Sequence, residues 1–182
     1  MAPTVPPVFA RTSHRMMRHE PPGELVLPNA GSDVVRVRRA SESDLDALMA
    51  IEQASFTSDR MRRRQYQRHL QSDTARVLVA SAGQGQVLGS AVLFLRRGSE
   101  LARLYSLATL PAARGQGVAG HLLQAAEHAG VLAGARRLRL EVRSDNPVAI
   151  HLYQQHGYRR IGHCPAYYAD GCDAWRYESS LF

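Results

Sequence analysis

Residues able to bind an anion are concentrated in the stretch from Leu101 to Gly120, LARLYSLATLPAARGQGVAG. The pattern predicts a buried strand up to Thr109, a turn at Pro111, a glycine-rich loop with Arg114, and the start of an apolar-faced helix. Backbone N–H groups at such a helix start converge on one spot, where the helix dipole also attracts negative charge. The stretch therefore predicts an anion site, and in particular a phosphate site.

The segment Gly115 to Gly120 also matches G-x-G-x-x-G of dinucleotide-binding folds, with Glu141 about 20 residues farther on. However, five residues including Pro111 separate the strand from the first glycine. Glu141 does not end its strand, because Val142 and Arg143 continue it. About 40 residues then remain, too few for a second nucleotide-binding half. A Walker-type loop is excluded because the sequence contains no lysine.

The spacing Arg114-x-x-Gly117-x-Ala119 fits a third interpretation, in which the glycine lets the backbone approach a pyrophosphate closely. Together with the LYSLAT strand before it and LEVRSDN…HLYQQHGY after it, this motif resembles the GNAT superfamily of acyl-CoA-dependent N-acetyltransferases. The resemblance covers about residues 34–182. Within the superfamily the chain looks most like the bacterial ribosomal-protein alanine N-acetyltransferases. The matching residues are Leu140-Glu141-Val142-Arg143, Asn146, Leu152-Tyr153, Gly157-Tyr158 and Tyr167-Tyr168-Ala169-Asp170-Gly171.

This resemblance implies that acetyl-CoA is the co-substrate. No metal is predicted, because the histidines of the chain lack the spacing of metal ligands. The edge of the strand at Leu107, Ala108 and Thr109 is expected to hold the pantetheine arm, and the glycine loop the pyrophosphate. The residues implied to bind the cofactor are Leu107, Ala108, Thr109, Arg114, Gly115, Gln116, Gly117, Val118, Ala119, Gly120 and Asn146. Glu141 is implied to be the general base, acting through water, and Tyr153 the general acid for the leaving thiolate.

Taken alone, each of these three side chains has a structural interpretation. Glu141 alternates with apolar residues on a strand, as a solvent-facing glutamate does, and Tyr153 could be a core tyrosine. Asn146 precedes Pro147 and could simply cap a helix. Asn146 and Tyr153 are seven residues apart, two helical turns, so they should point the same way.

A cysteine nucleophile is the mechanistic alternative. Cys164 and Cys172 flank a segment near the chain end, and either could carry an acetyl group in a ping-pong reaction. An isolated pair in a chain of this size is not a disulfide framework, so we expect two reduced thiols. The eight histidines show no spacing typical of metal ligands.

The elements that must position these residues alternate between strand and helix periodicity. Strands are predicted at 34–39, 76–81, 86–96, 101–109, 137–143, 158–162 and 173–181, and helices at 41–54, 60–71, 117–132 and 147–156. The order β-α-α-β-β-β-α-β-α-β-β predicts an α/β (α+β) fold with a mixed sheet. The resemblance implies a GNAT-like, mostly antiparallel sheet with helices on both faces. Residues 1–33 are rich in proline and arginine and are expected to form a flexible tail before one domain, 34–182.

Composition limits the possible partners. The longest apolar run, about Ala91 to Leu95, is far shorter than the roughly 20 residues that a membrane helix needs, and the start of the chain lacks a secretory signal pattern. We therefore expect a soluble, cytoplasmic protein that makes no membrane contact. Its net charge is +7 with arginine as the only strongly basic residue, and five arginines fall in the helix 60–71. That helix is interpreted as a solvated face, with steering of an acidic acceptor as the alternative.

The acceptor follows less directly from the residues. An α-amine titrates near 8 and a lysine near 10.4, so a carboxylate base faces roughly 2.5 pKa units less work on a protein N-terminus. We therefore expect an N-terminal α-amine as acceptor, with a small-molecule amine or a lysine side chain as alternatives. A non-catalytic acyl-CoA sensor or ribosome-associated module is the alternative of another class. Nucleic-acid binding is disfavoured because only Tyr66 is interleaved with the arginines of that helix. The sequence implies no particular oligomer.

Overall fold

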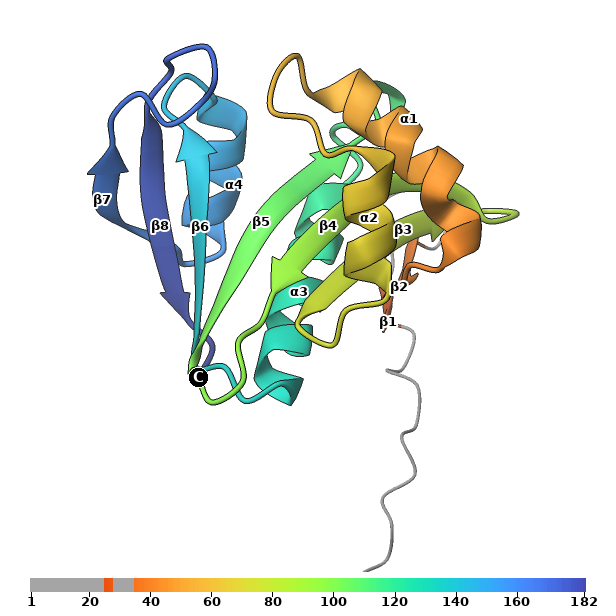
Figure 1. The fold of residues 1–182 in the computed structure, drawn as a ribbon, viewed down its shortest axis with the longest axis horizontal. Coiled ribbons are helices and arrows are strands. Elements are labelled where there is room, and N and C mark those ends of the chain that lie inside the picture. The colour runs from red at the N-terminus through yellow and green to blue at the C-terminus, as the bar shows by residue number, and fades with distance from the viewer. Residues whose placement is uncertain (1–24, 28–34) are drawn as a thin grey trace, which may run out of the picture.

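One mixed sheet organises the chain. The computed structural model describes residues 25–27 and 35–182, and the strands in this part lie in the order β1-β2-β3-β4-β5-β6-β8-β7 (Figure 1). Only β5 and β6 are parallel, and the other neighbours are antiparallel. The strands are β1 Leu25–Leu27, β2 Val35–Arg39, β3 Ala75–Ala82, β4 Gln86–Phe94, β5 Leu101–Thr109, β6 Arg137–Arg143, β7 Arg159–Cys164 and β8 Ala174–Ser180. The predicted mixed, mostly antiparallel sheet is confirmed.

Helices cover both faces of the sheet, as predicted. Helices α1 and α2 lie on one face, and α3 and α4 lie on the other (Figure 1). The helices are α1 Leu45–Ser55, α2 Arg63–Leu70, α3 Val118–Leu132 and α4 Pro147–Gln155, with short 3₁₀ turns at Glu42–Asp44 and Pro111–Ala113. The core is therefore divided into two layers by the sheet.

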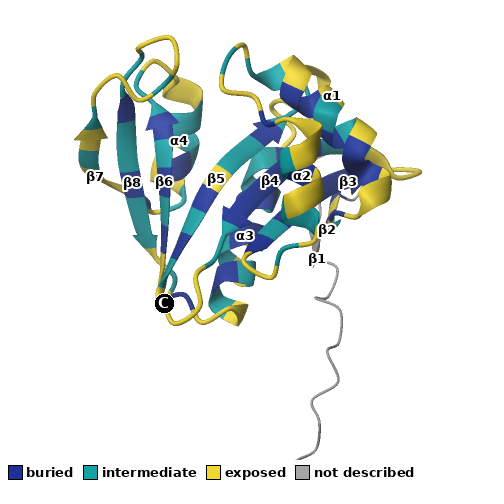
Figure 2. Ribbon diagram, viewed as in Figure 1, coloured by how far each residue is buried: buried dark blue, intermediate teal, exposed yellow. Residues whose placement is uncertain are grey.

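Strand β3 shows why the two layers form. Its alternate side chains Leu78 and Ala80 join the cluster beneath α3, whereas Val77 and Val79 join the cluster beneath α1 and α2. Successive side chains on a strand point to opposite faces, so an almost continuously apolar strand is buried on both sides. Figure 2 shows the resulting dark band of buried residues through the centre of the sheet.

Several boundaries differ from the predicted ones. Within the expected tail, residues 25–27 form β1, which pairs antiparallel with β2, and residues 1–24 and 28–33 lie outside the described residues. Helix α2 begins at Arg63 rather than Arg60, because the N–H of Arg62 donates to Gln65 Oε1 at 2.8 Å and caps the helix there. Ser41 caps the 3₁₀ turn before α1, and its N–H donates to Asp44 Oδ2 at 2.8 Å.

The feature that positions the site is the divergence of β5 from β6. The two strands pair only from Leu101 to Leu104, opposite Arg137 to Leu140, and then separate (Figure 1). Strand β5 continues along β4 as far as Thr109, with Tyr105 displaced from the register by a bulge. In the described part of the chain, β5 therefore has no strand partner on its β6 side beyond Leu104.

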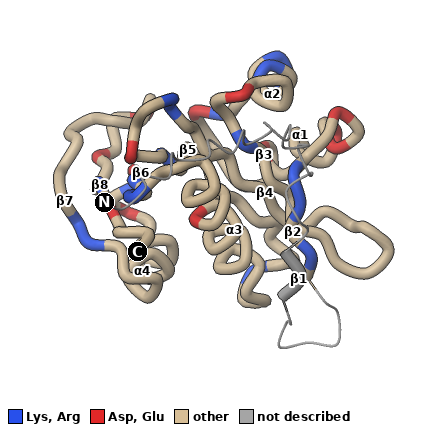
Figure 3. The backbone as a smooth tube through the Cα atoms, turned by 90° about the horizontal axis from the view of Figure 1, so that it is seen from below, with Lys and Arg blue, Asp and Glu red and all other residues tan. Residues whose placement is uncertain are grey.

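Basic residues are spread over the molecule rather than gathered on one face. Figure 3 shows them on α2 and along several strands, interspersed with acidic residues. On α2 the residues Arg63, Arg64 and Arg68 are exposed, as predicted, and Arg63 is paired with Asp46. Among the described residues, no helix is long and apolar enough to cross a membrane.

Candidate active site

Two adjoining cavities open where β5 and β6 diverge. The glycine-loop cavity, beside residues 114–120, has a volume of about 570 Å³. The Glu141 cavity, beside the end of β6, has a volume of about 380 Å³. Both lie in the range of small-ligand sites, roughly 300–1,000 Å³. The residues that line both cavities are Ser55, Phe56, Leu107, Asn146, Ala149 and Tyr153. Molecules bound in the two cavities would therefore meet at these residues.

The glycine-loop cavity collects the residues predicted to bind the cofactor, with one exception. Its lining includes Leu107, Ala108, Thr109, Arg114, Gly115, Gly117, Val118, Ala119, Gly120 and Asn146. Gln116 does not line it, because its side-chain amide turns back and donates to the backbone oxygen of Ala112 at 2.9 Å. For Gln116, the predicted cofactor contact would therefore be made by its backbone rather than by its side chain.

The loop conformation depends on its glycines. Gly115 and Gly117 have φ values of +76° and +75°, in the left-handed region where a Cβ is costly. Gly117 is also the N-cap of α3, and within the described residues no side chain caps the first turn of that helix. The N–H groups at the start of α3 are therefore available to an anion beside Arg114, as a pyrophosphate requires.

The free edge of β5 provides the second part of this cavity. Leu107 pairs with Ala91 and Thr109 with Gly89, so β4 satisfies only one edge of the strand. On the other edge, Ser55 Oγ donates to the backbone oxygen of Thr109 at 3.3 Å. Backbone groups along the rest of this edge can bond an extended chain such as pantetheine, as an added strand would. The cavity therefore fits acetyl-CoA in both its phosphate-binding and its backbone-binding parts.

Helix α4 brings Asn146 and Tyr153 to the junction of the cavities. Asn146 Oδ1 accepts from the N–H of Ala149 at 3.0 Å, which caps the helix, while the residue also lines both cavities. The Tyr153 ring packs against Tyr158, with centroids 5.8 Å apart, and is almost wholly buried. Burial, reinforced by the nearby Tyr168, raises the pKa of Tyr153 above its ordinary value. The phenol therefore keeps its proton at neutral pH.

Strand β6 holds Glu141 between two arginines. Its side chain is 7% exposed, so Glu141 is not the solvent-facing glutamate that strand alternation alone allows. Arg103 Nε donates to Glu141 Oε2 at 2.9 Å, and Arg176 Nε donates to Oε1 at 2.9 Å. Each carboxylate oxygen has a further lone pair, so a water molecule can still bind there.

The Glu141 cavity is walled by four segments that are far apart in the sequence. They are the α1–α2 connection (56–62), β5, the end of β6 and the β7–β8 connection (165–173), and helices α1 and α4 complete the lining through Glu52, Ser55, Asn146, Ala149 and Tyr153. The first and last segments touch each other, because the N–H of Ala169 donates to Asp59 Oδ2 at 3.1 Å. Arg143 anchors the last segment through Asp170 at 2.9 Å and lies over the Tyr168 ring, 4.9 Å from its centroid.

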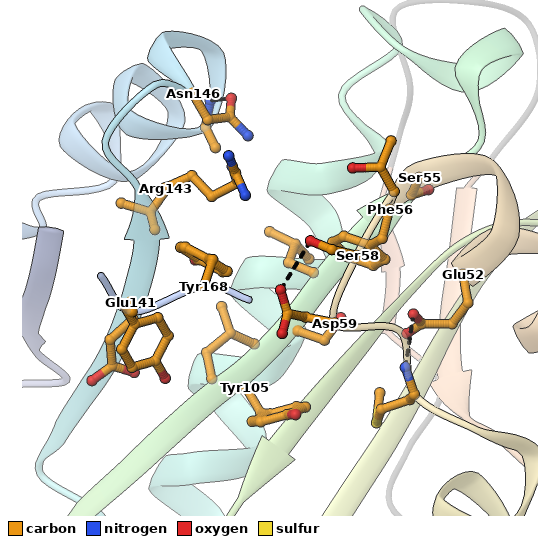
Figure 4. A pocket seen from close by; sticks show the side chains of 18 of the residues that line it. Glu52, Ser55, Phe56, Ser58, Asp59, Tyr105, Glu141, Arg143, Asn146 and Tyr168 are labelled. Atoms are coloured by element: carbon orange, nitrogen blue, oxygen red, sulfur yellow. Dashed lines mark hydrogen bonds between the residues drawn. The ribbon is translucent and has the colours of Figure 1, made fainter. Parts of the chain in front are cut away.

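Glu52 is a residue of this cavity that the sequence prediction missed. Figure 4 shows it on the side of the cavity opposite Glu141. It is 2% exposed, accepts from Tyr66 Oη at 2.8 Å and from the N–H of Met61 at 3.3 Å, and its pKa is raised by burial. A glutamate within the apolar stripe of α1 is the sequence signal that could have identified it.

The cysteine alternative receives no support from the geometry. Cys164 and Cys172 are both half-buried free thiols, and neither lines either cavity in the described part of the chain. Cys172 Sγ donates to the backbone oxygen of Asp173 at 3.4 Å. Across the described residues, the structure groups no three potential metal-ligating side chains.

Comparison with known proteins agrees with this arrangement. The model of the acetyltransferase (GNAT) family matches residues 45–158, well over half of the chain. The chain therefore belongs to the GNAT acetyltransferase family.

Individual relatives add detail. N-alpha-acetyltransferase 30 of Schizosaccharomyces pombe is 38% identical over 71 residues, which are 39% of this chain and 47% of that protein. The chain spans less than half the length of the curated relatives it matches. The ribosomal-protein-S18-alanine N-acetyltransferase of Escherichia coli shares the fold, with a TM-score of 0.72, 23% identity, and coverage of 81% of this chain and 94% of that one. The NatC complex bound to Gag peptide and CoA also contains this fold, with a TM-score of 0.71, 18% identity, and coverage of 81% and 99%.

Proposed function

We propose that the protein transfers an acetyl group from acetyl-CoA to the N-terminal α-amine of a protein or peptide by direct attack in a ternary complex. The observation that carries this proposal is the junction of the two cavities at Asn146 and Tyr153. One cavity fits the cofactor and the other contains the carboxylate of Glu141. Two reactants bound in this way would be held side by side, which is the main requirement of a reaction between two bound molecules.

Acetyl-CoA supplies the acetyl group as a thioester. In this proposal Arg114 and the N–H groups of residues 115–120 hold its pyrophosphate, Leu107 to Thr109 pair with its pantetheine arm, and Asn146 contacts it at the start of α4.

Glu141 and Tyr153 have complementary proton roles. An amine at neutral pH is mostly an ammonium ion and must lose a proton before it can attack a carbonyl. Glu141 takes up that proton through a water molecule, for which its oxygens have free lone pairs. Tyr153 remains protonated because its pKa is raised by burial. In this proposal the amine nitrogen forms a bond to the acetyl carbon as the C–S bond of the thioester breaks. Tyr153, where the two cavities meet, is the general acid: it donates a hydrogen bond to the departing sulfur, passes its proton to the thiolate, and regains a proton from water.

The shape of the Glu141 cavity favours the end of a chain as acceptor. Two connections, joined by the hydrogen bond between Ala169 and Asp59, line the part of the cavity that we take as its entrance. They contribute Tyr167 and Tyr168 from one connection and Ser58 and Asp59 from the other. Hydroxyl and carboxylate groups at an entrance can bond the amides of an extended peptide. The local identity to an N-alpha-acetyltransferase supports the same acceptor. We place the reaction in the cytoplasm, where the two free thiols stay reduced.

A matched set of peptides tests the acceptor. We expect turnover of acetyl-CoA, measured as thiol release, with peptides that begin with Ala or Ser. N-blocked peptides of the same sequence that contain lysine should give rates near background. Turnover only with the blocked peptides, or only with small amines, would exclude the N-terminal acceptor while retaining the enzyme class. Tight CoA binding without thiol release for any amine would instead indicate a binding module.

A further inference from the structure

Arg103 is the one side chain seen to join Glu141 to the entrance of its cavity among the described residues. Its Nε donates to Glu141 Oε2 at 2.9 Å, and its terminal nitrogen donates to Tyr167 Oη at 2.6 Å. Tyr167 belongs to the β7–β8 connection, 64 residues away from Arg103 in the chain. A single guanidinium thus contacts both the proposed base and the segment that borders the acceptor.

The position of Arg103 follows from the strand register. Arg103 lies opposite Arg139 in the parallel ladder, one residue before the last pair, where β5 and β6 begin to diverge. Glu141 is two residues farther along β6, on the same face of the sheet as Arg139. Only a long side chain can span this diagonal. The guanidinium carbon also lies over the Tyr105 ring, 5.8 Å from the ring centroid.

Arg176 provides an informative contrast. It binds the other oxygen of Glu141, also at 2.9 Å, but it does not line the Glu141 cavity and has no hydrogen bond to Tyr167 among the described residues. Two arginines, Arg103 and Arg176, therefore each place a positive charge beside the Glu141 carboxylate. Of these two arginines, only Arg103 also bonds to the β7–β8 connection among the described residues.

We propose that Arg103 is a positioning residue that fixes the Glu141 carboxylate and the Tyr167 hydroxyl in one arrangement, so that the base and the acceptor-binding segment are set together. This inference rests on the proposed function and identifies a determinant of acceptor use beyond Glu141 and Tyr153. It requires arginine rather than lysine, because the planar guanidinium donates in two directions at once whereas an ammonium on a flexible stem is a single point charge.

Kinetics of Arg103→Gln and Arg103→Lys, with Arg139→Gln as the matched control, test this proposal. Arg139 lies beside Arg103 in the register and binds Glu178 at 2.7 Å, but it lines neither cavity.

We expect Arg103→Gln to lower kcat/KM for the peptide by about 10- to 100-fold, the size of a lost charge-assisted hydrogen bond. The effect should appear in both kcat and the peptide KM, with the KM for acetyl-CoA unchanged. Arg103→Lys should recover part of kcat and little of the peptide KM. Arg139→Gln should stay within about 2-fold of wild type.

Double-mutant cycles distinguish positioning from general stability. In a Glu141→Gln background, Arg103→Gln should lower kcat by less than about 3-fold, because the base that it positions is already lost. In a Tyr167→Phe background, it should no longer raise the peptide KM. Arg176→Gln should lower kcat and leave the peptide KM near wild type.

Thermal unfolding of each variant and binding of the peptide without acetyl-CoA supply readouts that do not depend on turnover. The role of Arg103 is overturned if Arg103→Gln behaves like Arg139→Gln, or if its effects multiply fully with those of Glu141→Gln. It is also overturned if Arg103→Lys restores wild-type values. A wild-type protein that acetylates no amine would instead count against the proposed function, whereas these outcomes in an active protein count against Arg103 alone.

Discussion

The glycine-loop cavity and the Glu141 cavity adjoin each other, yet they are built in different ways. The first is formed mainly by backbone, from the free edge of β5 and the loop that enters α3. Its key features, a positive φ at Gly115 and an uncapped helix start, are local properties of one continuous stretch. Such a site suits a ligand that is the same in every turnover.

The Glu141 cavity is formed mainly by side chains that come from several separate segments, including α1, β5, β6, α4 and two connections. Its charged groups are held by long-range contacts, such as Arg103 with Glu141 and Asp59 with the N–H of Ala169. We expect substitutions at these residues to alter the Glu141 cavity and to leave the glycine loop intact. Under the proposed function, the fold would then fix cofactor use, whereas dispersed side chains would decide which acceptor is used.

The largest effect is expected where the two cavities meet. Glu141→Gln and Tyr153→Phe should each lower kcat by about 10²-fold or more, because each removes a group that we propose moves a proton, with little change in the KM for acetyl-CoA. The measurement is steady-state thiol release with the best peptide acceptor.

Tyr158→Phe is the matched control for Tyr153→Phe. The Tyr158 ring packs against Tyr153, but its hydroxyl donates to Glu127 at 3.0 Å and lines neither cavity. Its loss should cost about 1 kcal/mol of stability and leave kcat unchanged. Near-wild-type rates for both Glu141→Gln and Tyr153→Phe would remove these two residues from the mechanism.

A smaller effect, confined to the cofactor, is expected at Gly115. Gly115→Ala places a Cβ on a residue with φ of +76°, which should cost about 1–2 kcal/mol and distort the loop. Gly134→Ala introduces the same strain at φ of +86° in the turn between α3 and β6, and in both places a Cβ would meet open space. Both variants should lose similar stability on thermal unfolding. Only Gly115→Ala should raise the KM for acetyl-CoA, by about 10-fold per 1.4 kcal/mol of lost binding. Equal KM values would show that the loop conformation does not matter for binding.

The same contrast explains how much could be predicted from sequence. The motif from Arg114 to Gly120, the order of strands and helices and the sheet class all follow from local patterns, and the fold confirms the order and the class. The observed ends of helices and strands differ from the predicted ones by a few residues where a capping contact or a pairing strand sets the end. The cap at Arg62, which starts α2 at Arg63, is an example. Strand β1 was missed because its place depends on pairing with β2.

The long-range contacts could not be predicted in this way. Nothing near Arg103 in the sequence indicates that it reaches Glu141, 38 residues away, or Tyr167, 64 residues away. The sequence likewise does not indicate that Glu52 is buried at this cavity, where it accepts from Tyr66 of the next helix. A single sequence predicts periodicity well, but it does not specify which distant side chains meet.

The smallest effect is expected at the entrance of the Glu141 cavity. Asp59 has φ of +55°, a conformation that asparagine also tolerates, so Asp59→Asn removes the charge without straining the backbone. It also keeps an oxygen for the N–H of Ala169. Because the acceptor arrives as an ammonium ion, we expect the peptide KM to rise by about 2- to 5-fold at low salt, with kcat and the KM for acetyl-CoA unchanged.

Salt provides the decisive check on Asp59. An exposed charge acts through solvent, so the difference between Asp59→Asn and wild type should disappear near 1 M salt, where the screening length is about 3 Å. Asp73 is another exposed carboxylate, which pairs with Arg97 and lines neither cavity, and Asp73→Asn should show no difference from wild type at any salt concentration. If Asp59→Asn raised the KM for acetyl-CoA instead, the two cavities would not be independent, and the separation of cofactor from acceptor recognition argued above would be wrong.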